Sequence, residues 1–112
     1  METIIHRIRL TDIGQYQTFE RWVCERDYAA CHDLPSVLGF DVHRVSLEPD
    51  ADCHYMEIIR VSSQADFERD METPTFKGLE RDFSTMAEVT DEIAGHQIGQ
   101  GYRKAQSETA HA

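Results

Sequence analysis

Positive charge is scarce in this sequence. Its 112 residues hold 11 Lys and Arg against 21 Asp and Glu, so the formal net charge is −10 at pH 7. Because such a chain repels the phosphates of nucleic acids and an anionic membrane surface, we expect neither among its partners. Apolar runs are short as well, and none reaches the ~18 residues that indicate a membrane span. The first ten residues, METIIHRIRL, place charges among apolar positions, so the sequence predicts a cytoplasmic protein.

Cysteine is also rare. The three cysteines, Cys24, Cys31 and Cys53, are odd in number and lack CxxC spacing, which favours reduced thiols over a disulfide framework or a structural zinc site. We interpret Cys31 and Cys53 as small apolar side chains. The length suits one hydrophobic core, and the composition is that of a globular domain. We expect a single domain over residues 1–104 and a flexible polar tail over residues 105–112.

The apolar residues that are present follow two periods. Alternation with a period of two predicts strands, and apolar positions three or four residues apart predict helices. Thr11 or Asp12 can cap the first helix, and Leu34-Pro35 ends it because the residue before proline avoids the α region. The predicted strands are residues 3–10, 37–47, 53–61 and 91–102. The predicted helices are residues 13–31 and a second segment that begins near Ser63, is interrupted at Thr73-Pro74 and ends at residue 86.

This βαββαβ order is typical of a ferredoxin-like α+β fold, an antiparallel sheet with both helices on one face. The other face of the predicted sheet mixes apolar and charged side chains, namely Ile5, Tyr55, Ile59 and Val61 with Arg7, Arg9 and Glu57. Because a small domain does not easily leave such a surface in water, we expect a homodimer. Glu57 is expected to form a cross-strand ion pair on this dimer face.

Alternation along the strands sorts the histidines by face. In the first strand, His6 alternates in step with Ile8, so both are expected to face the helices. In the third strand, His54 alternates in step with Met56, so both are expected to face the helices as well. These strands are neighbours in the predicted sheet, so the two imidazoles are expected to lie close together beneath the helices. Asp27 falls near the centre of the buried stripe of the first helix and should face them.

A carboxylate in an apolar stripe is costly unless it is paired, and the two histidines are its candidate partners. A histidine held by a carboxylate has the fixed tautomer and raised basicity of a general base. We therefore interpret His6, His54 and Asp27 as a catalytic set in which Asp27 orients one histidine. The alternative, in which both histidines are satisfied core residues, stays open. Trp22 is expected to point away. The predicted substrate-contacting residues are Tyr28, Ile8, Met56, Phe76 and Val23.

Whole phrases of the sequence resemble one protein family. They are IIHRIRL, FERWV, RDYAAC, LPSV, HYMEI, FERDMETPTF and AEVTDEIAG, spread over residues 3–102. These phrases are similar to the RedY-like, or HapK-like, proteins of prodigiosin-type pigment pathways, within the dimeric α+β barrel superfamily. The resemblance implies a homodimer that needs no cofactor or metal and acts in a tailoring step on a pyrrole or indole intermediate. It also implies hydrolase-like activity.

A more distant resemblance is to polyketide cyclases of the olivetolic acid type, whose first-strand and third-strand pocket histidines match His6 and His54. Their catalytic histidine follows a proline in the second helical segment, where this chain has Thr75 and Phe76. The sequence therefore predicts a cofactor-independent enzyme of secondary metabolism that hydrolyses an amide-like or carbinolamide-like group of a small heteroaromatic molecule. The alternatives are proton-transfer cyclisation, a binding protein for a reactive intermediate, and a metal-dependent enzyme with a two-His, one-carboxylate site.

Overall fold

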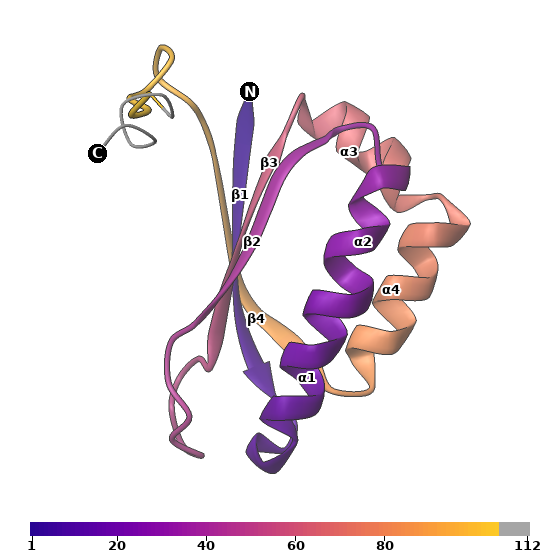
Figure 1. Ribbon diagram of the computed structural model, residues 1–112, viewed down its shortest axis with the longest axis vertical. Helices are drawn as coiled ribbons and strands as arrows, with labels where there is room; N and C mark the ends of the chain where they lie inside the picture. Colours follow the sequence, from indigo (N-terminus) through magenta and orange to yellow (C-terminus); the bar gives the residue numbers. More distant parts are fainter. Residues whose placement is uncertain (106–112) are drawn as a thin grey trace.

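A four-stranded antiparallel sheet carries all the helices on one of its faces (Figure 1). The computed structural model of the protein describes residues 1–105, so all but the first residue of the predicted tail, 105–112, lies outside the described residues. The strands are β1 (Glu2–Leu10), β2 (Val37–Arg44), β3 (Tyr55–Val61) and β4 (Ala87–His96). Their order in the sheet is β2-β3-β1-β4, which confirms the predicted fold and makes β1 and β3 neighbours.

The first helical segment runs from Ile13 to Asp33 and is continuous, as predicted. It opens with one turn of 3-10 helix, which Asp12 caps by accepting a hydrogen bond from the Gly14 N–H. Its central parts are α1 (Tyr16–Trp22) and α2 (Tyr28–Ala30). Between them lies a π turn over Val23–Asp27, in which the N–H of Tyr28 bonds the carbonyl of Val23 five residues earlier. Such turns occur often at functional sites.

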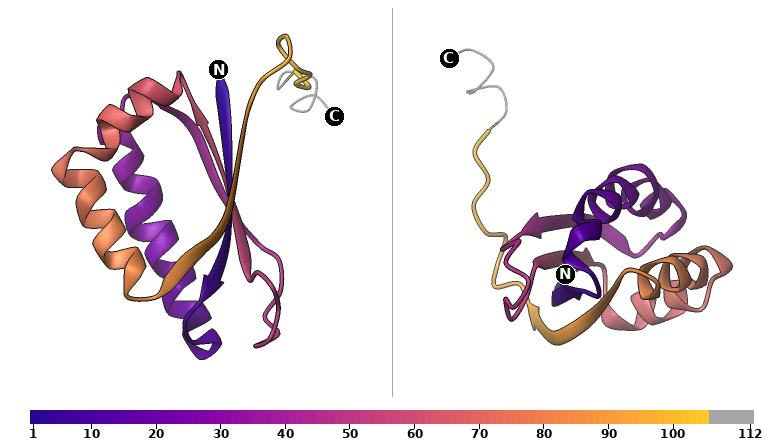
Figure 2. Two further views of the ribbon diagram at one scale, coloured as in Figure 1. Left: turned by 180° about the vertical axis from the view of Figure 1, so that it is seen from behind. Right: turned by 90° about the horizontal axis from the view of Figure 1, so that it is seen from below.

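The second helical segment is divided where the sequence predicts. Its helices are α3 (Gln64–Met71) and α4 (Pro74–Ser84). The Ser63 hydroxyl caps α3 by accepting from the Asp66 N–H at 3.0 Å, and Thr73 caps α4 in the same way. Proline at the first position of α4 suits a helix start, because its missing N–H has no partner there in any case. Both helices cover the same face of the sheet as α1 and α2 (Figure 2).

The last strand differs from the prediction. It begins at Ala87 and ends at His96, rather than spanning residues 91–102. Nearly every residue of β4 is exposed, so apolar and polar residues alternate only weakly along it. The sequence pattern therefore gives no signal for the residue at which this strand begins. Beyond its end, Gly99 and Gly101 adopt φ angles of 60° and 67°, in the left-handed region that glycine enters at little cost and that an extended strand does not use.

The faces of β3 were predicted the wrong way round. Tyr55, Ile59 and Val61 are buried beneath the helices, and Met56 lies on the open face of the sheet. Both faces of this strand carry large apolar side chains, so a period of two cannot decide between them. The consequence is that Glu57 also lies on the helix side, opposite the predicted dimer face.

A partly exposed ion network joins the first helix to the sheet. Glu20 of α1 accepts hydrogen bonds from the Tyr55 hydroxyl at 2.6 Å and from the Arg44 guanidinium at 2.6 and 2.7 Å. The Arg44 hydrogen bonds, more than the Tyr55 one, hold the pKa of Glu20 below its ordinary value despite burial. Because this contact joins α1 to both β2 and β3, it fixes the height of the first helix above the sheet. None of the helices within residues 1–105 is long and apolar enough to cross a bilayer.

Candidate functional site

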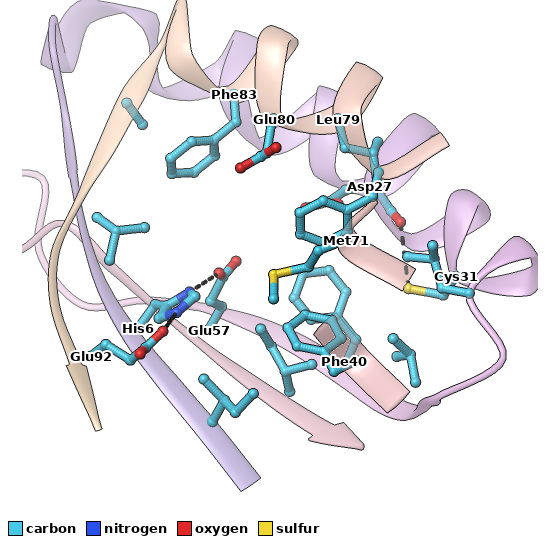
Figure 3. Close-up of a pocket in the computed structure, with 18 of the residues that line it drawn as sticks. His6, Asp27, Cys31, Phe40, Glu57, Met71, Leu79, Glu80, Phe83 and Glu92 are labelled. Atoms are coloured by element: carbon cyan, nitrogen blue, oxygen red, sulfur yellow. Dashed lines mark hydrogen bonds and ion pairs between the residues drawn. The ribbon is translucent and has the colours of Figure 1, made fainter. Parts of the chain in front are cut away.

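A cavity of about 650 Å³ lies between the helices and the sheet (Figure 3). This volume is in the range of sites that hold small organic ligands. All four strands contribute to its floor, and α3, α4 and the first helical segment form its wall. The aromatic side chains in contact with it are Trp22, Phe40, Phe67, Phe76 and Phe83.

His6 stands on the floor of this cavity between two carboxylates. Its Nδ1 is 2.6 Å from a carboxylate oxygen of Glu57, and its Nε2 is 2.6 Å from one of Glu92. The sheet register produces this arrangement, because His6 of β1 lies directly opposite Glu57 of β3 on one side and Glu92 of β4 on the other. The carboxylate partners of His6 are therefore Glu57 and Glu92, and the predicted pairing with Asp27 is wrong.

These contacts favour the charged form of His6. Ionised carboxylates only accept hydrogen bonds, so an imidazole that bonds one at each nitrogen must donate from both and is an imidazolium. Burial by itself lowers the pKa of His6, but the hydrogen bonds and charges of Glu57 and Glu92 outweigh it and raise that pKa above its ordinary value. The Glu57 side chain is 13% exposed and the Glu92 side chain 62% exposed, so Glu92 is the partner that a ligand can displace.

Asp27 ends the π turn and enters the cavity across from His6 (Figure 3). Burial, reinforced by the negative charge of Glu57, raises the pKa of Asp27 to about 7. A carboxyl group that titrates near neutrality can give or take a proton at physiological pH, which an ordinary aspartate cannot do. The prediction that Asp27 faces the cavity from the first helix is confirmed.

Cys31 lies one turn beyond Asp27 and also lines the cavity. Its thiol donates to the backbone carbonyl of Asp27 at 3.6 Å. Burial, and then the charge of Asp27, raise the pKa of Cys31 to about 11. Because the thiolate is the nucleophilic form, this cysteine is a poor nucleophile at neutral pH, in keeping with its interpretation as a small apolar side chain.

His54 does not reach the cavity. It is 1% exposed and lies just before β3, where its Nδ1 accepts from the Leu10 N–H at 2.9 Å and its Nε2 bonds the Glu48 carbonyl at 2.9 Å. A backbone N–H can only donate, so the ring is the neutral tautomer with its proton on Nε2. His54 thus links the end of β1 to the loop before β3. The predicted proximity of the two imidazoles is wrong, because it rested on the reversed faces of β3.

The predicted substrate-contacting residues are dispersed. Phe76 lines the cavity as expected. Ile8 and Val23 are buried in the core beside it, and Met56 lies on the open face of the sheet. Tyr28 is exposed, and its hydroxyl accepts from the Val42 N–H at 3.0 Å, so it stands outside this cavity.

Three cavity residues escaped the sequence interpretation. Glu57 was assigned to the wrong face, and Glu92 belongs to a strand whose start and register were missed. Trp22, expected to point away, lines the cavity and packs at 6.5 Å between ring centroids against Phe83. Trp22 lies three residues after the buried Phe19 in the regular helix α1, and the two ring centroids are 6.2 Å apart, so it shares the covered side of that helix.

The structure does not assemble the two-His, one-carboxylate site that the sequence left open, since His54 is committed to Leu10 and Glu48. Over residues 1–105, no three side chains of His, Cys, Asp or Glu are grouped in a way that could hold a metal ion. His6, Glu57, Glu92 and Asp27 bring one imidazole and three carboxyl groups to the same cavity.

Solved structures define the class of fold. The chain superposes on SnoaB, a cofactor-independent oxygenase from Streptomyces nogalater, with a TM-score of 0.65 and 16% sequence identity over 88% of this chain and 94% of that one. A putative antibiotic biosynthesis monooxygenase from Chloroflexus aurantiacus gives a TM-score of 0.69 at 14% identity, over 90% and 96% of the two chains. At these identities the likeness shows the ferredoxin-like fold alone.

One structure is far more similar. The crystal structure of HapK from Hahella chejuensis shares 56% sequence identity with this chain, covers 94% of it and 100% of its own length, and superposes with a TM-score of 0.93. The sequence profile of the family described as REDY-like protein HapK matches residues 2–98. The chain therefore belongs to the REDY-like HapK family, as its phrases predicted. Among curated proteins, none matches the sequence.

The position of His54 predicts a structural role, and mutation can distinguish this role from a catalytic one. Replacing His54 with Ala leaves the buried Leu10 N–H without an acceptor, so we expect the free energy of unfolding to fall by about 2–4 kcal/mol. Urea denaturation followed by circular dichroism measures this change. The matched control is His43→Ala on the open face, for which we expect a change within about 0.5 kcal/mol. Equal effects of the two substitutions would contradict the role assigned to His54.

The raised pKa of Asp27 predicts a pH-dependent cost to stability. The unfolded chain ionises Asp27 near 3.8 and the folded chain only near 7, so the wild type loses stability as pH rises between these values. The variant Asp27→Asn lacks this loss. We expect its stability relative to the wild type to be higher at pH 8 than at pH 4 by about 1–3 kcal/mol in urea denaturation. The exposed Asp33→Asn is the control, and a pH-independent difference for Asp27→Asn would rule out the burial effect.

Proposed function

We propose that the protein is a tailoring enzyme of secondary metabolism that hydrolyses an amide-like or carbinolamide-like group of a small indole or pyrrole intermediate, using its own acidic and basic side chains. One observation carries the proposal: an imidazolium at His6 and a carboxyl group of near-neutral pKa at Asp27 face each other across a cavity with an aromatic lining. Membership of the REDY-like HapK family, and the resemblance to proteins of prodigiosin-type pathways, support the choice of pathway and substrate class.

The geometry suits a division of labour between the two groups. A substrate between them would present its carbonyl oxygen to His6 and its carbonyl carbon to a water molecule near Asp27. The Asp27 carboxylate takes a proton from the water as its oxygen bonds to carbon, and the His6 imidazolium stabilises the oxyanion that forms. The C–N bond then breaks, and Asp27 returns the proton to the leaving nitrogen. Water is consumed, and an acid and an amine are released.

Glu57 positions His6 in this scheme. It is the less exposed of the two carboxylates and keeps the imidazole charged and aimed into the cavity. Glu92 is more exposed. When its side chain moves aside, the Nε2 of His6 is free to donate a hydrogen bond to the substrate. This arrangement reverses the assignment made from sequence, in which Asp27 orients a histidine base.

The catalytic roles predict distinct losses of activity. We expect His6→Asn and Asp27→Asn each to lower kcat/KM by about 10²–10⁴-fold, because each removes a proton-transfer or charge-stabilising group. Hydrolysis of indole-3-carboxamide and pyrrole-2-carboxamide, followed by NMR, provides the assay. For the wild type, kcat/KM should rise with pH and level off above about 7, as Asp27 ionises.

Two further variants sharpen this test. Glu57→Gln should lower kcat more than it raises KM and should restore part of the rate at lower pH, where His6 stays protonated without help. Glu25→Gln, an exposed change outside the cavity, should leave the profile unaltered. Full turnover by the His6 and Asp27 variants would refute the mechanism, and binding of the amides without turnover would indicate a carrier of a reactive intermediate instead.

The open face of the sheet supports the predicted homodimer, which we also propose. Ile58, Ile5 and Ile93 lie opposite one another on β3, β1 and β4 and form an apolar row across it. The chain after β4 extends on the side away from the helices (Figures 1 and 2) and carries Ile98 and Tyr102, 89% and 79% exposed. A second copy related by a two-fold axis would cover both features at once.

Replacing the most exposed isoleucine of the row tests the dimer. Ile93 is 65% exposed, and a charge at this position would have to be buried between the two copies. In light scattering after size exclusion, we expect the wild type to have the mass of two chains and Ile93→Lys to have the mass of one chain. Ala29→Lys, on the helix layer, is the control and should remain a dimer. A monomeric wild type would overturn the proposal.

A further inference from the structure

The charged residues that line the cavity are mostly of one sign. Besides His6, they are all acidic, and no Lys or Arg of residues 1–105 contributes to the lining. Glu88 is among them, but it lies opposite Arg9 of β1 and directs its side chain to the open face. The carboxyl groups at the cavity are therefore those of Asp27, Glu57, Glu68, Glu80 and Glu92, of which Glu68 and Glu80 are additional to Asp27 and to the two partners of His6.

These two additional carboxylates come from two helices and are exposed. Glu68 belongs to α3 and Glu80 to α4, so together with Glu57 and Glu92 of the sheet they place negative charge on both the helix side and the sheet side of the cavity. In Figure 3 the Glu80 carboxylate lies beside Phe83, on the cavity side of α4. The single imidazolium of His6 is already shared by Glu57 and Glu92 and leaves the other carboxylates uncompensated.

Aromatic rings fill the spaces between these charges. Phe67 and Phe76 meet edge to face with their centroids 5.7 Å apart, and Trp22 and Phe83 lie 6.5 Å apart. The faces of aromatic rings are electron-rich and attract cations, most strongly when the charge is partly removed from water. The rings therefore favour a flat ligand, and both the rings and the carboxylates favour a positively charged one.

We propose that the ligand of this cavity is an aromatic molecule that carries a protonated nitrogen, such as an amine, amidine or iminium group. This inference rests on the proposed function in taking the cavity as the substrate site, and it adds the charge of the substrate. Phosphorylated ligands, coenzyme A thioesters and free carboxylates are disfavoured by the same wall, because like charges repel, most strongly at the half-buried Glu57 and less strongly at the exposed Glu68 and Glu80. The acid formed by hydrolysis would be expelled, while the amine would be retained longer.

Three probes that share an indole ring and a two-carbon side chain test the charge preference by titration calorimetry at neutral pH. They are tryptamine, tryptophol and indole-3-propionate, which end in an ammonium, a hydroxyl and a carboxylate. We expect tryptamine to bind about tenfold or more tightly than indole-3-propionate, with tryptophol between them, and we expect this ratio to fall as salt is added. Equal or tighter binding of indole-3-propionate would overturn the proposal, as would failure of all three probes to bind in the millimolar range.

Charge reversal on the wall supplies the matched comparison. Glu80→Lys should reduce the preference for tryptamine over indole-3-propionate by about tenfold, and Glu68→Lys should do the same from α3. Glu25→Lys makes an equal change of charge on the exposed side of the first helix and should leave the ratio nearly unchanged. An equal shift in all three variants would show that net charge, not the cavity wall, sets the preference. Because these are binding measurements, an intact preference without amide hydrolysis would refute the proposed reaction alone.

Discussion

The pairing of β1 with β3 decides where the charged groups of the cavity stand. Its register is continuous from Glu2 to Ile8 and sets His6 directly opposite Glu57. Side chains alternate between the faces of a sheet, so a shift of one residue would send one member of this pair to the open face and leave the other unpaired beneath the helices. The apolar residues on either side, Ile4 with Ile59 and Ile8 with Tyr55, hold the register through the core.

Glu57 acts on both ends of the cavity through that position. Its charge keeps a proton on His6, which raises one pKa, and it also opposes the ionisation of Asp27, which raises another. At neutral pH the imidazole of His6 therefore stays charged, while the carboxyl group of Asp27 readily exchanges its proton. A single half-buried carboxylate on a strand thus raises the pKa of two groups that do not contact each other.

Much of this architecture is readable from the sequence, because it depends on short-range signals. The capping signal at Ser63, the interruption at Thr73-Pro74 and the alternation of β1 are local, and they led to the right element order and to a cavity containing His6, Asp27 and Phe76. The face of β3 was not readable, since apolar residues occupy both of its sides. The exposed edge strand β4, which supplies Glu92, has too little apolar pattern to reveal its register. The site was therefore half predicted: the parts carried by β1 and the first helix, but not those carried by β3 and β4.

The π turn over Val23–Asp27 makes the length of the first helix a property of the site. A π turn holds one residue more than the α turn it replaces, so deletion of a single residue there would restore a regular helix and leave the ends of the helix in place. Only the side chains within the turn, Asp27 among them, would take new directions. Among relatives of this chain, the number of residues between Phe19 and Leu34, both buried, should therefore distinguish proteins that keep the acidic group in the cavity from proteins that share only the fold.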